Sequence, residues 1–88
     1  MRERDIEAYL AKRVKAMGGE IRKAQWIGRV GAPDRRVMLP HRAPVWVELK
    51  APGVKPEAHQ IREHNRMRRL GELVLVIDSL EGVEELLS

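Results

Sequence analysis

Hydrophobic positions along the chain follow three patterns, each typical of one kind of element. In residues 3–17 they recur three or four positions apart, which predicts a helix that ends at Gly18. In residues 45–50 the side chains alternate in character, which predicts a strand with one buried face. Residues 73–77 form a continuous apolar run, which indicates a strand buried inside a sheet.

The segments between these elements predict the rest of the fold. Two more strands are expected at residues 20–27 and 35–39, a second helix at residues 57–70, and a short last helix that carries Leu80, Val83 and Leu87. The predicted order is α-β-β-β-α-β-α, which indicates an α/β fold with a mixed central sheet flanked by helices. Because 88 residues can bury only a small core, we expect one domain that spans residues 1–88.

Composition excludes several classes of protein. The chain has no Cys, which excludes disulfide scaffolds, Cys-ligated zinc sites and thiol nucleophiles. No apolar run reaches the roughly 18 residues of a membrane span, and the first residues do not form a signal peptide. We therefore expect a soluble, intracellular protein of the cytoplasm.

Charge is distributed unevenly along the chain. Residues 1–70 carry all 17 Lys and Arg against eight acids, a net charge of +9, whereas residues 71–88 carry five acids and no base. A basic surface on a small domain is typical of a nucleic-acid partner, although it is also compatible with an ordinary solvated surface. Because only three residues are aromatic, contact with phosphates is a better expectation than base stacking on the sheet.

The two middle strands are expected to pair as a hairpin across a five-residue turn at residues 40–44. With Leu39 opposite Val45, Asp34 lies opposite Lys50 and diagonal to Glu48, all on one face of the sheet. Two such carboxylates can share Mg²⁺, and a nearby Lys can orient or deprotonate a water molecule. Spacing alone leaves open, and slightly favours, a surface cluster of ion pairs.

Several short segments together resemble a known group of nucleases. Gly31-Ala-Pro-Asp34 followed by Glu48-Leu-Lys50 resembles the bipartite PD-(D/E)XK signature of metal-dependent nucleases. The flanking residues extend this likeness to the VRR-NUC domain family; they are Arg35, Val47, Ala51-Pro52, Gln60, Leu70-Gly71 and Val76-Ile-Asp-Ser79. The match covers nearly the whole chain, which implies a stand-alone domain with a restriction-endonuclease-like core, from a bacterial or phage-like source.

The resemblance assigns roles to individual residues. It implies that Asp34 and Glu48 bind Mg²⁺ or Mn²⁺, that the backbone carbonyl of Leu49 completes the coordination, and that Lys50 serves the attacking water. Glu7 matches an acid on the first helix of related nucleases and is a further candidate for catalysis or metal binding. On a helical wheel Glu7 falls at the edge of the apolar stripe, so it can reach the sheet. Glu3 projects at a similar angle, and an exposed helix acid remains an alternative.

Other side chains are weaker candidates. Gln60 corresponds to the Gln that the family places on the helix after the ExK strand, and a buried Gln bound to backbone is the competing interpretation. Lys23, Arg35 and Arg36 are candidates for DNA binding, with ordinary exposed cations as the alternative. His59 and His64 have the spacing of zinc ligands, but without Cys partners they are more often solvated or packed against a helix. A role of Trp46 in the core, under the first helix, is favoured over a role in catalysis.

Together these observations predict a metal-dependent, structure-selective DNA endonuclease of DNA repair that hydrolyses phosphodiester bonds, with four-way (Holliday) junctions as the leading substrate. Cutting a junction at two symmetric positions calls for two active sites, which predicts a homodimer. The alternatives are a monomeric flap or single-strand nuclease and a catalytically silent DNA-binding module.

Overall fold

The computed structural model describes all 88 residues as three helices and four strands. In chain order they are α1 (Glu3–Ala16), β1 (Glu20–Lys23), β2 (Arg35–Met38), β3 (Val45–Leu49), α2 (Ala58–Arg69), β4 (Val74–Ile77) and α3 (Leu80–Leu87). This order, α-β-β-β-α-β-α, confirms the prediction. None of the three helices combines the length and apolar character required to cross a membrane.

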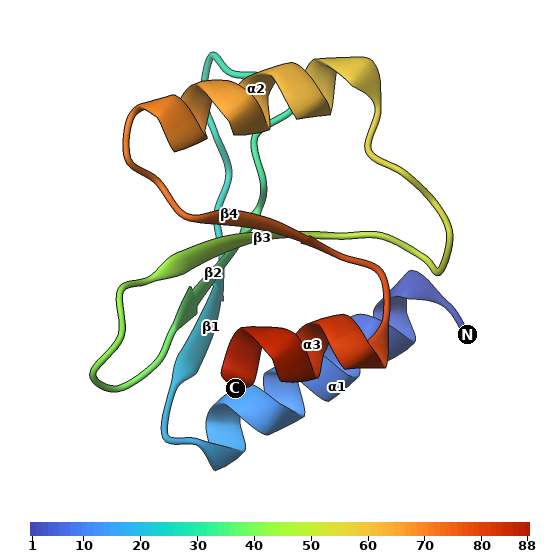
Figure 1. The fold of residues 1–88 in the computed structure, drawn as a ribbon, viewed down its shortest axis with the longest axis vertical. Coiled ribbons are helices and arrows are strands. Elements are labelled where there is room, and N and C mark those ends of the chain that lie inside the picture. Colours follow the sequence, from blue (N-terminus) through green and yellow to red (C-terminus); the bar gives the residue numbers. More distant parts are fainter.

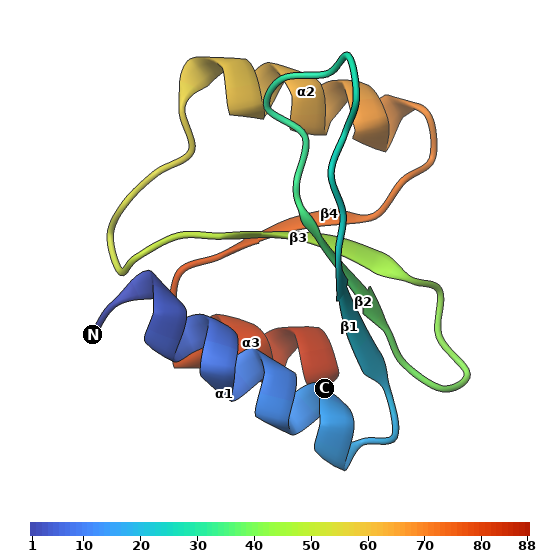
Figure 2. The same cartoon turned by 180° about the vertical axis from the view of Figure 1, so that it is seen from behind.

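The four strands form one mixed sheet in the order β1-β2-β3-β4. β2 pairs antiparallel with both β1 and β3, whereas β3 and β4 run parallel. A parallel pair needs a crossover connection, and α2 supplies it. As Figure 1 and Figure 2 show, α2 lies over one face of the sheet, while α1 and α3 lie side by side over the other.

The core lies between the sheet and the pair α1 and α3. Helical spacing places Ile6, Leu10 and Val14 on one face of α1, and all three are completely buried. The alternating positions of β2 and β3, with residues of β4 and α3, complete this cluster; they are Val37, Leu39, Val45, Val47, Leu49, Ile77, Val83 and Leu87. The prediction that the strand at residues 45–50 has one buried face is therefore confirmed.

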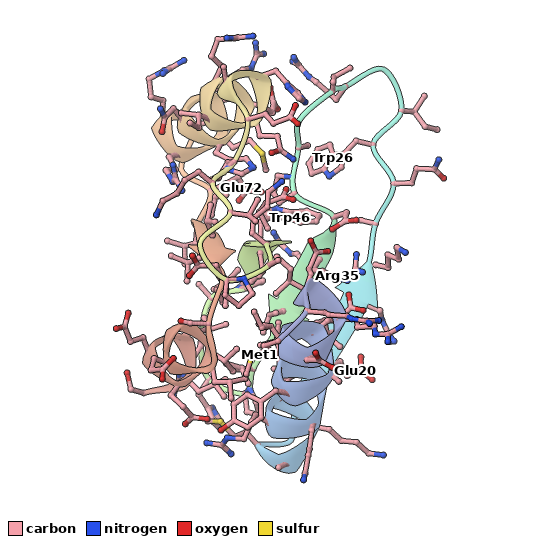
Figure 3. All side chains as sticks on the ribbon, turned by 90° about the vertical axis from the view of Figure 1, so that its right-hand side faces the viewer. Met1, Glu20, Trp26, Arg35, Trp46 and Glu72 are labelled. Atoms are coloured by element: carbon pink, nitrogen blue, oxygen red, sulfur yellow. The ribbon has the colours of Figure 1, made fainter.

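Trp46 lies on the other face of the sheet, so the prediction that it packs under the first helix is wrong. Its ring is 5.0 Å from that of Trp26 between centroids, and the Arg36 guanidinium lies 4.7 Å from its centroid. Figure 3 shows Trp26 and Trp46 together on the α2 side of the sheet, with Arg35 beside α1. The reason is the two-residue period of a strand, which directs Trp46 away from Val45 and Val47.

The hairpin register differs by two residues from the prediction. Val37, rather than Leu39, lies opposite Val45, so the connection is longer than the expected five residues. Pro40 and Pro44 have no N–H to donate to a ladder, so the strands separate before they reach these residues. Since the shift is an even number of residues, every side chain keeps its predicted face.

The first strand is shorter than the predicted residues 20–27. The ladder with β2 continues one residue past Lys23, where the Ala24 N–H donates to the Asp34 carbonyl at 2.9 Å. Residues 25–33 then leave the sheet as a loop. Gly28 and Gly31 both have positive φ, which bends this loop back toward β2.

A polar cluster joins α1 to α3 beside the core. The Glu84 carboxylate accepts hydrogen bonds from Tyr9 Oη at 2.7 Å and from Arg13 Nε at 2.8 Å. The bonds from Arg13 and from Tyr9 lower the pKa of Glu84 from 4.5 to about 2. The ionised form of Glu84 therefore stabilises the packing of the two helices.

Replacing Glu84 by Gln is expected to lower the melting temperature at pH 7 slightly, because the ion pair with Arg13 is partly exposed and screened by solvent. A carboxyl whose pKa is depressed in the folded state stabilises the fold above its unfolded pKa, and this contribution is lost as pH falls toward the folded pKa. The difference between wild type and Glu84→Gln should therefore shrink between pH 4.5 and about 2. Thermal unfolding measured across this range tests it. Glu85→Gln, at an exposed neighbour, is the control, and an equal effect in both variants would contradict the assignment.

Candidate active site

The structure brings Asp34, Glu48 and Lys50 together where β2 begins and β3 ends. Arg35 lies opposite Val47, so extending the register by one residue places Asp34 opposite Glu48 rather than opposite Lys50 as predicted. Lys50 Nζ lies 4.0 Å from Glu48 Oε2. The three residues therefore lie at one end of the β2–β3 pair, even though the predicted pairing was displaced.

Glu48 lies within polar groups from α2, and its side chain is only 13% exposed. Gln60 Nε2 approaches Glu48 Oε2 at 3.5 Å, and His64 Nε2 lies 3.6 Å from Glu48 Oε1. Gln60 also accepts a hydrogen bond from the backbone N–H of Glu57 at 2.9 Å through its Oε1. That bond fixes the amide, because the oxygen is engaged at the helix start and the NH₂ group is left to face Glu48.

Burial raises the pKa of Glu48. Lys50 opposes this shift, while the negative charges of Asp34 and Glu3 add to it. An ionised Glu48 is therefore costly in the protein alone, and a bound cation would offset both the burial and the repulsion. Groups with perturbed pKa values of this kind are common at functional sites.

Arg35 connects Asp34 to α1. Its Nη1 lies 2.9 Å from Asp34 Oδ2, its Nε donates to Glu7, and its side chain is only 15% exposed. Burial by itself would lower the pKa of Arg35, but the hydrogen bond with Glu7 and the charge of Asp34 outweigh it, and the pKa is raised. Glu7 therefore reaches the site through Arg35. The α1 acid whose charge acts on Glu48 is Glu3, which was the rival candidate.

The other two DNA-binding candidates differ in their surroundings. Lys23 is exposed at the end of β1 and, with Trp26, Arg29 and Asp34, lines a surface hollow of about 610 Å³. Arg36 instead lies over the Trp46 ring, with Nη1 3.7 Å from Glu72 Oε1. Lys23 and Arg29 are therefore the cations that line the hollow beside Asp34. Arg29 also has an acidic partner, since its Nη1 lies 3.8 Å from Glu63 Oε1, so Lys23 is the cation of the hollow without an ion pair.

His64 is the residue whose place in the site was not predicted from the sequence. It is 1% exposed, and its Nε2 has no hydrogen-bond partner. Burial and the charge of Arg68 lower the pKa of His64, which keeps the ring neutral at pH 7. His59 lies apart, with Nδ1 3.5 Å from Glu57. The one signal for His64 was its position four residues after Gln60, on the same helix face.

The donors at the site fit a hard divalent cation. No three His, Asp or Glu side chains lie close enough to bind a metal ion by themselves. Asp34 and Glu48 supply carboxylate oxygens, and the Leu49 carbonyl lies between Glu48 and Lys50 along the strand. Mg²⁺ is usually bound by one or two carboxylates together with waters and substrate phosphates. The two carboxylates and the carbonyl found here match that coordination.

Comparison with known proteins identifies the family. The chain matches no family model. It is 47% identical over 79 residues to "Putative nuclease p44" of Acyrthosiphon pisum secondary endosymbiont phage 1. The aligned residues cover 90% of this chain and 85% of that protein. It also matches a solved structure described as a VRR_NUC domain, with a TM-score of 0.86 and 41% identity over 97% of this chain and 92% of the other. The chain belongs to the VRR-NUC family.

Proposed function

We propose that the protein is a Mg²⁺- or Mn²⁺-dependent, structure-selective DNA endonuclease that cuts four-way junctions. The observation that carries this proposal is that Lys50 Nζ lies 4.0 Å from the largely buried Glu48, with Asp34 at the same end of the strand pair, on a chain of a nuclease family. A surface cluster of ion pairs, the alternative from spacing alone, would not require Gln60 and His64 to approach a carboxylate that is 13% exposed.

The proposed oxygen ligands come from β3 and from the residue just before β2. Asp34 and Glu48 hold the metal ion together with the Leu49 carbonyl, and Arg35 keeps Asp34 oriented through the contact at 2.9 Å. Gln60 and His64 restrict the Glu48 carboxylate from the α2 side. A divalent cation bound there would polarise the scissile phosphate and lower the pKa of the attacking water.

Lys50 serves the attacking water. Its side chain is 15% exposed, and its ammonium group is held within 4.0 Å of Glu48, at the same end of the sheet as Asp34. From there Lys50 can orient the water for in-line attack or accept its proton. The leaving oxygen then departs on the opposite side of the phosphorus.

The substrate is held mainly through its phosphates. Lys23 and Arg29 face the hollow beside Asp34, where they complement the charge of a DNA backbone. Affinity should therefore fall steeply as salt concentration rises and depend little on base sequence. The five acids after Gly71 would repel phosphates, so DNA approaches from the side of the basic residues.

The proposal predicts cleavage that depends on the metal ion and on DNA structure. The test is incubation with labelled linear, single-stranded, flap, fork and four-way junction DNA in Mg²⁺, Mn²⁺, Ca²⁺ or excess EDTA. We expect cutting with Mg²⁺ and Mn²⁺ and fastest on the junction, with Ca²⁺ supporting binding but little cleavage because its coordination is looser. Undiminished cutting in EDTA would rule out the metal ion, and salt-sensitive binding without any cutting would identify a DNA-binding module.

We also propose that the active form is a homodimer. A junction has approximate two-fold symmetry, and two copies of one site can cut its opposed strands at symmetric positions. Light scattering at micromolar concentration should give the mass of two chains, and the junction should show paired nicks. A monomer that leaves unpaired nicks would instead support a flap or single-strand nuclease.

A further inference from the structure

Two apolar side chains project from the loop of residues 25–33, next to the candidate active site. Ile27 is 97% exposed and Val30 is 76% exposed, and they flank Gly28 and Arg29 at the tip. No other large apolar residue is as exposed as Ile27. Residues of this kind are normally buried, so a pair of them beside an active site calls for an explanation.

The base of the loop is held by hydrogen bonds and packing, so flexibility of the whole loop does not explain why these residues are exposed. The Ala24 N–H donates to the Asp34 carbonyl at 2.9 Å, and Trp26 Nε1 donates across the loop to the Pro33 carbonyl at 2.7 Å. Gly31, with φ of 88°, packs so closely on α2 that a Cβ there would lie 2.8 Å from the His59 carbonyl oxygen. Figure 2 shows the loop running alongside α2. Both ends of the loop are therefore fixed before any partner binds, which limits where the tip can lie.

The tip is close to the proposed scissile phosphate. Val30 precedes Asp34 by four residues, so their Cα atoms are separated by about 14 Å at most. That distance corresponds to about four steps of 3.4 Å along one DNA strand. Lys23, Arg29 and Asp34 line the hollow of about 610 Å³ at the foot of the loop. A DNA strand with its phosphate at Asp34 therefore passes within reach of Val30, and Ile27 lies three residues before Val30 in the same loop.

We propose that Ile27 and Val30 form an apolar wedge that stacks on the exposed base pair where DNA strands diverge. The inference rests on the proposed nuclease function and names the element that selects branched DNA. Arg29 at the tip and Lys23 at the foot of the loop complement a polyanion, which argues for DNA as the occupant over an apolar peptide or a second copy of this chain. Apolar side chains inserted at base steps are an established mode of DNA contact.

Selectivity follows from what each DNA structure exposes. In an unbroken duplex every base face is covered by its neighbours, so the wedge must unstack a step before it can make contact. At a branch point a base face is already open. Branched DNA therefore gains the stacking contact without that cost, while linear duplex does not.

The test compares two double variants on the same DNA panel. Ile27→Ser/Val30→Ser should lower the ratio of junction cleavage to linear-duplex cleavage about 10-fold, the size expected when the burial of one aliphatic side chain against a base is lost. Leu70→Ser/Leu73→Ser is the control, because it removes side chains that are 74% and 50% exposed where the chain enters β4, at the sheet edge opposite β1. The control should keep the wild-type ratio, and Ile27→Leu/Val30→Leu should restore most of it.

A second readout needs no cleavage. Junction DNA with 2-aminopurine beside the branch should change its fluorescence on binding the Lys50→Ala protein, and the change should disappear when Ile27 and Val30 are also Ser. If the Ile27→Ser/Val30→Ser substitutions leave both the cleavage ratio and the fluorescence change on binding as they are without them, the wedge is overturned. A variant that loses self-association but not selectivity would show that the pair contacts a second copy instead. A wild-type protein that cuts none of the DNAs would contradict the proposed function, while the fluorescence would still test the wedge.

Discussion

Replacing Lys50 by Ala should reduce DNA cleavage at least about 100-fold and leave the fold and the DNA affinity close to wild type. Positioned proton transfer contributes about 10²- to 10⁴-fold to the rate of a reaction, and Lys50 is the one ammonium group within 4.0 Å of Glu48. Its loss removes one of the 17 basic residues of the chain, so binding through phosphates should change little. Single-turnover cleavage, salt-dependent binding and thermal unfolding measure the three properties separately.

Two further variants separate the possible roles of Lys50. Arg cannot give up its proton near neutral pH, so Lys50→Arg should be as inactive as Lys50→Ala if the residue accepts a proton, and partly active if it orients the water by charge alone. Lys55→Ala, at an exposed Lys five residues on, is the matched control and should cut at the wild-type rate. If Lys50→Ala also cuts at that rate, Lys50 is only a surface cation.

The side-chain faces of the sheet could be predicted because they depend on parity alone. The register, extended by one residue, places Asp34 opposite Glu48 with both on their expected face, although the hairpin is displaced by two residues. A displacement of one residue would have sent every side chain to the other face, and burial of Val37 and Val47 prevents that. The sequence therefore predicted which residues share a face better than it predicted which residues pair.

The contacts of the arginines could not be predicted in the same way. Arg35 was expected to bind DNA, but α1 places Glu7 beside it, and the packing of a helix on a sheet is set by contacts far apart in the chain. Arg36 likewise lies over Trp46, in a stack that depends on the loop that brings Trp26 back to the sheet. Net charge indicated a polyanion partner, but it could not show which cations remain available.

His64 and the loop tip show a second limit of reasoning from sequence. A His four residues after Gln60 is compatible with either a core residue or a site residue, and only the approach of α2 to β3 places its Nε2 3.6 Å from Glu48. Residues 25–27 continue the strand pattern of residues 20–23, which is why the sequence predicts a strand longer than the observed β1. The turn at Gly28 and the hydrogen bond from Trp26 to Pro33 depend on residues on both sides of the loop.

Replacing Glu48 by Gln should abolish cleavage and metal binding, yet make the metal-free protein more stable. Burial and the charges of Asp34 and Glu3 raise the pKa of Glu48, so the folded protein favours its neutral form more than the unfolded chain does. At neutral pH the ionised wild-type residue therefore costs stability that an uncharged Gln of the same shape avoids. A gain of about 1 kcal/mol, or about 4–8 °C in Tm, is the size expected for a functional residue of this kind in a domain of this length.

The stability difference between Glu48→Gln and wild type should depend on pH. An acid with a raised folded pKa destabilises the fold above that pKa, and the penalty disappears as pH falls through the folded value toward the ordinary value of 4.5. The stability advantage of Glu48→Gln should therefore be full at pH 8 and absent at about pH 4.

Added Mg²⁺ or Mn²⁺ should raise the Tm of wild type but not of Glu48→Gln, because only a ligand that binds the folded state shifts unfolding. Glu85→Gln, at an exposed position, should match wild type throughout. A metal-free Glu48→Gln protein that is less stable than wild type at pH 8 would mean that the contacts of Glu48 with Lys50, Gln60 and His64 outweigh its burial, and that the site is organised for structure rather than for a cation.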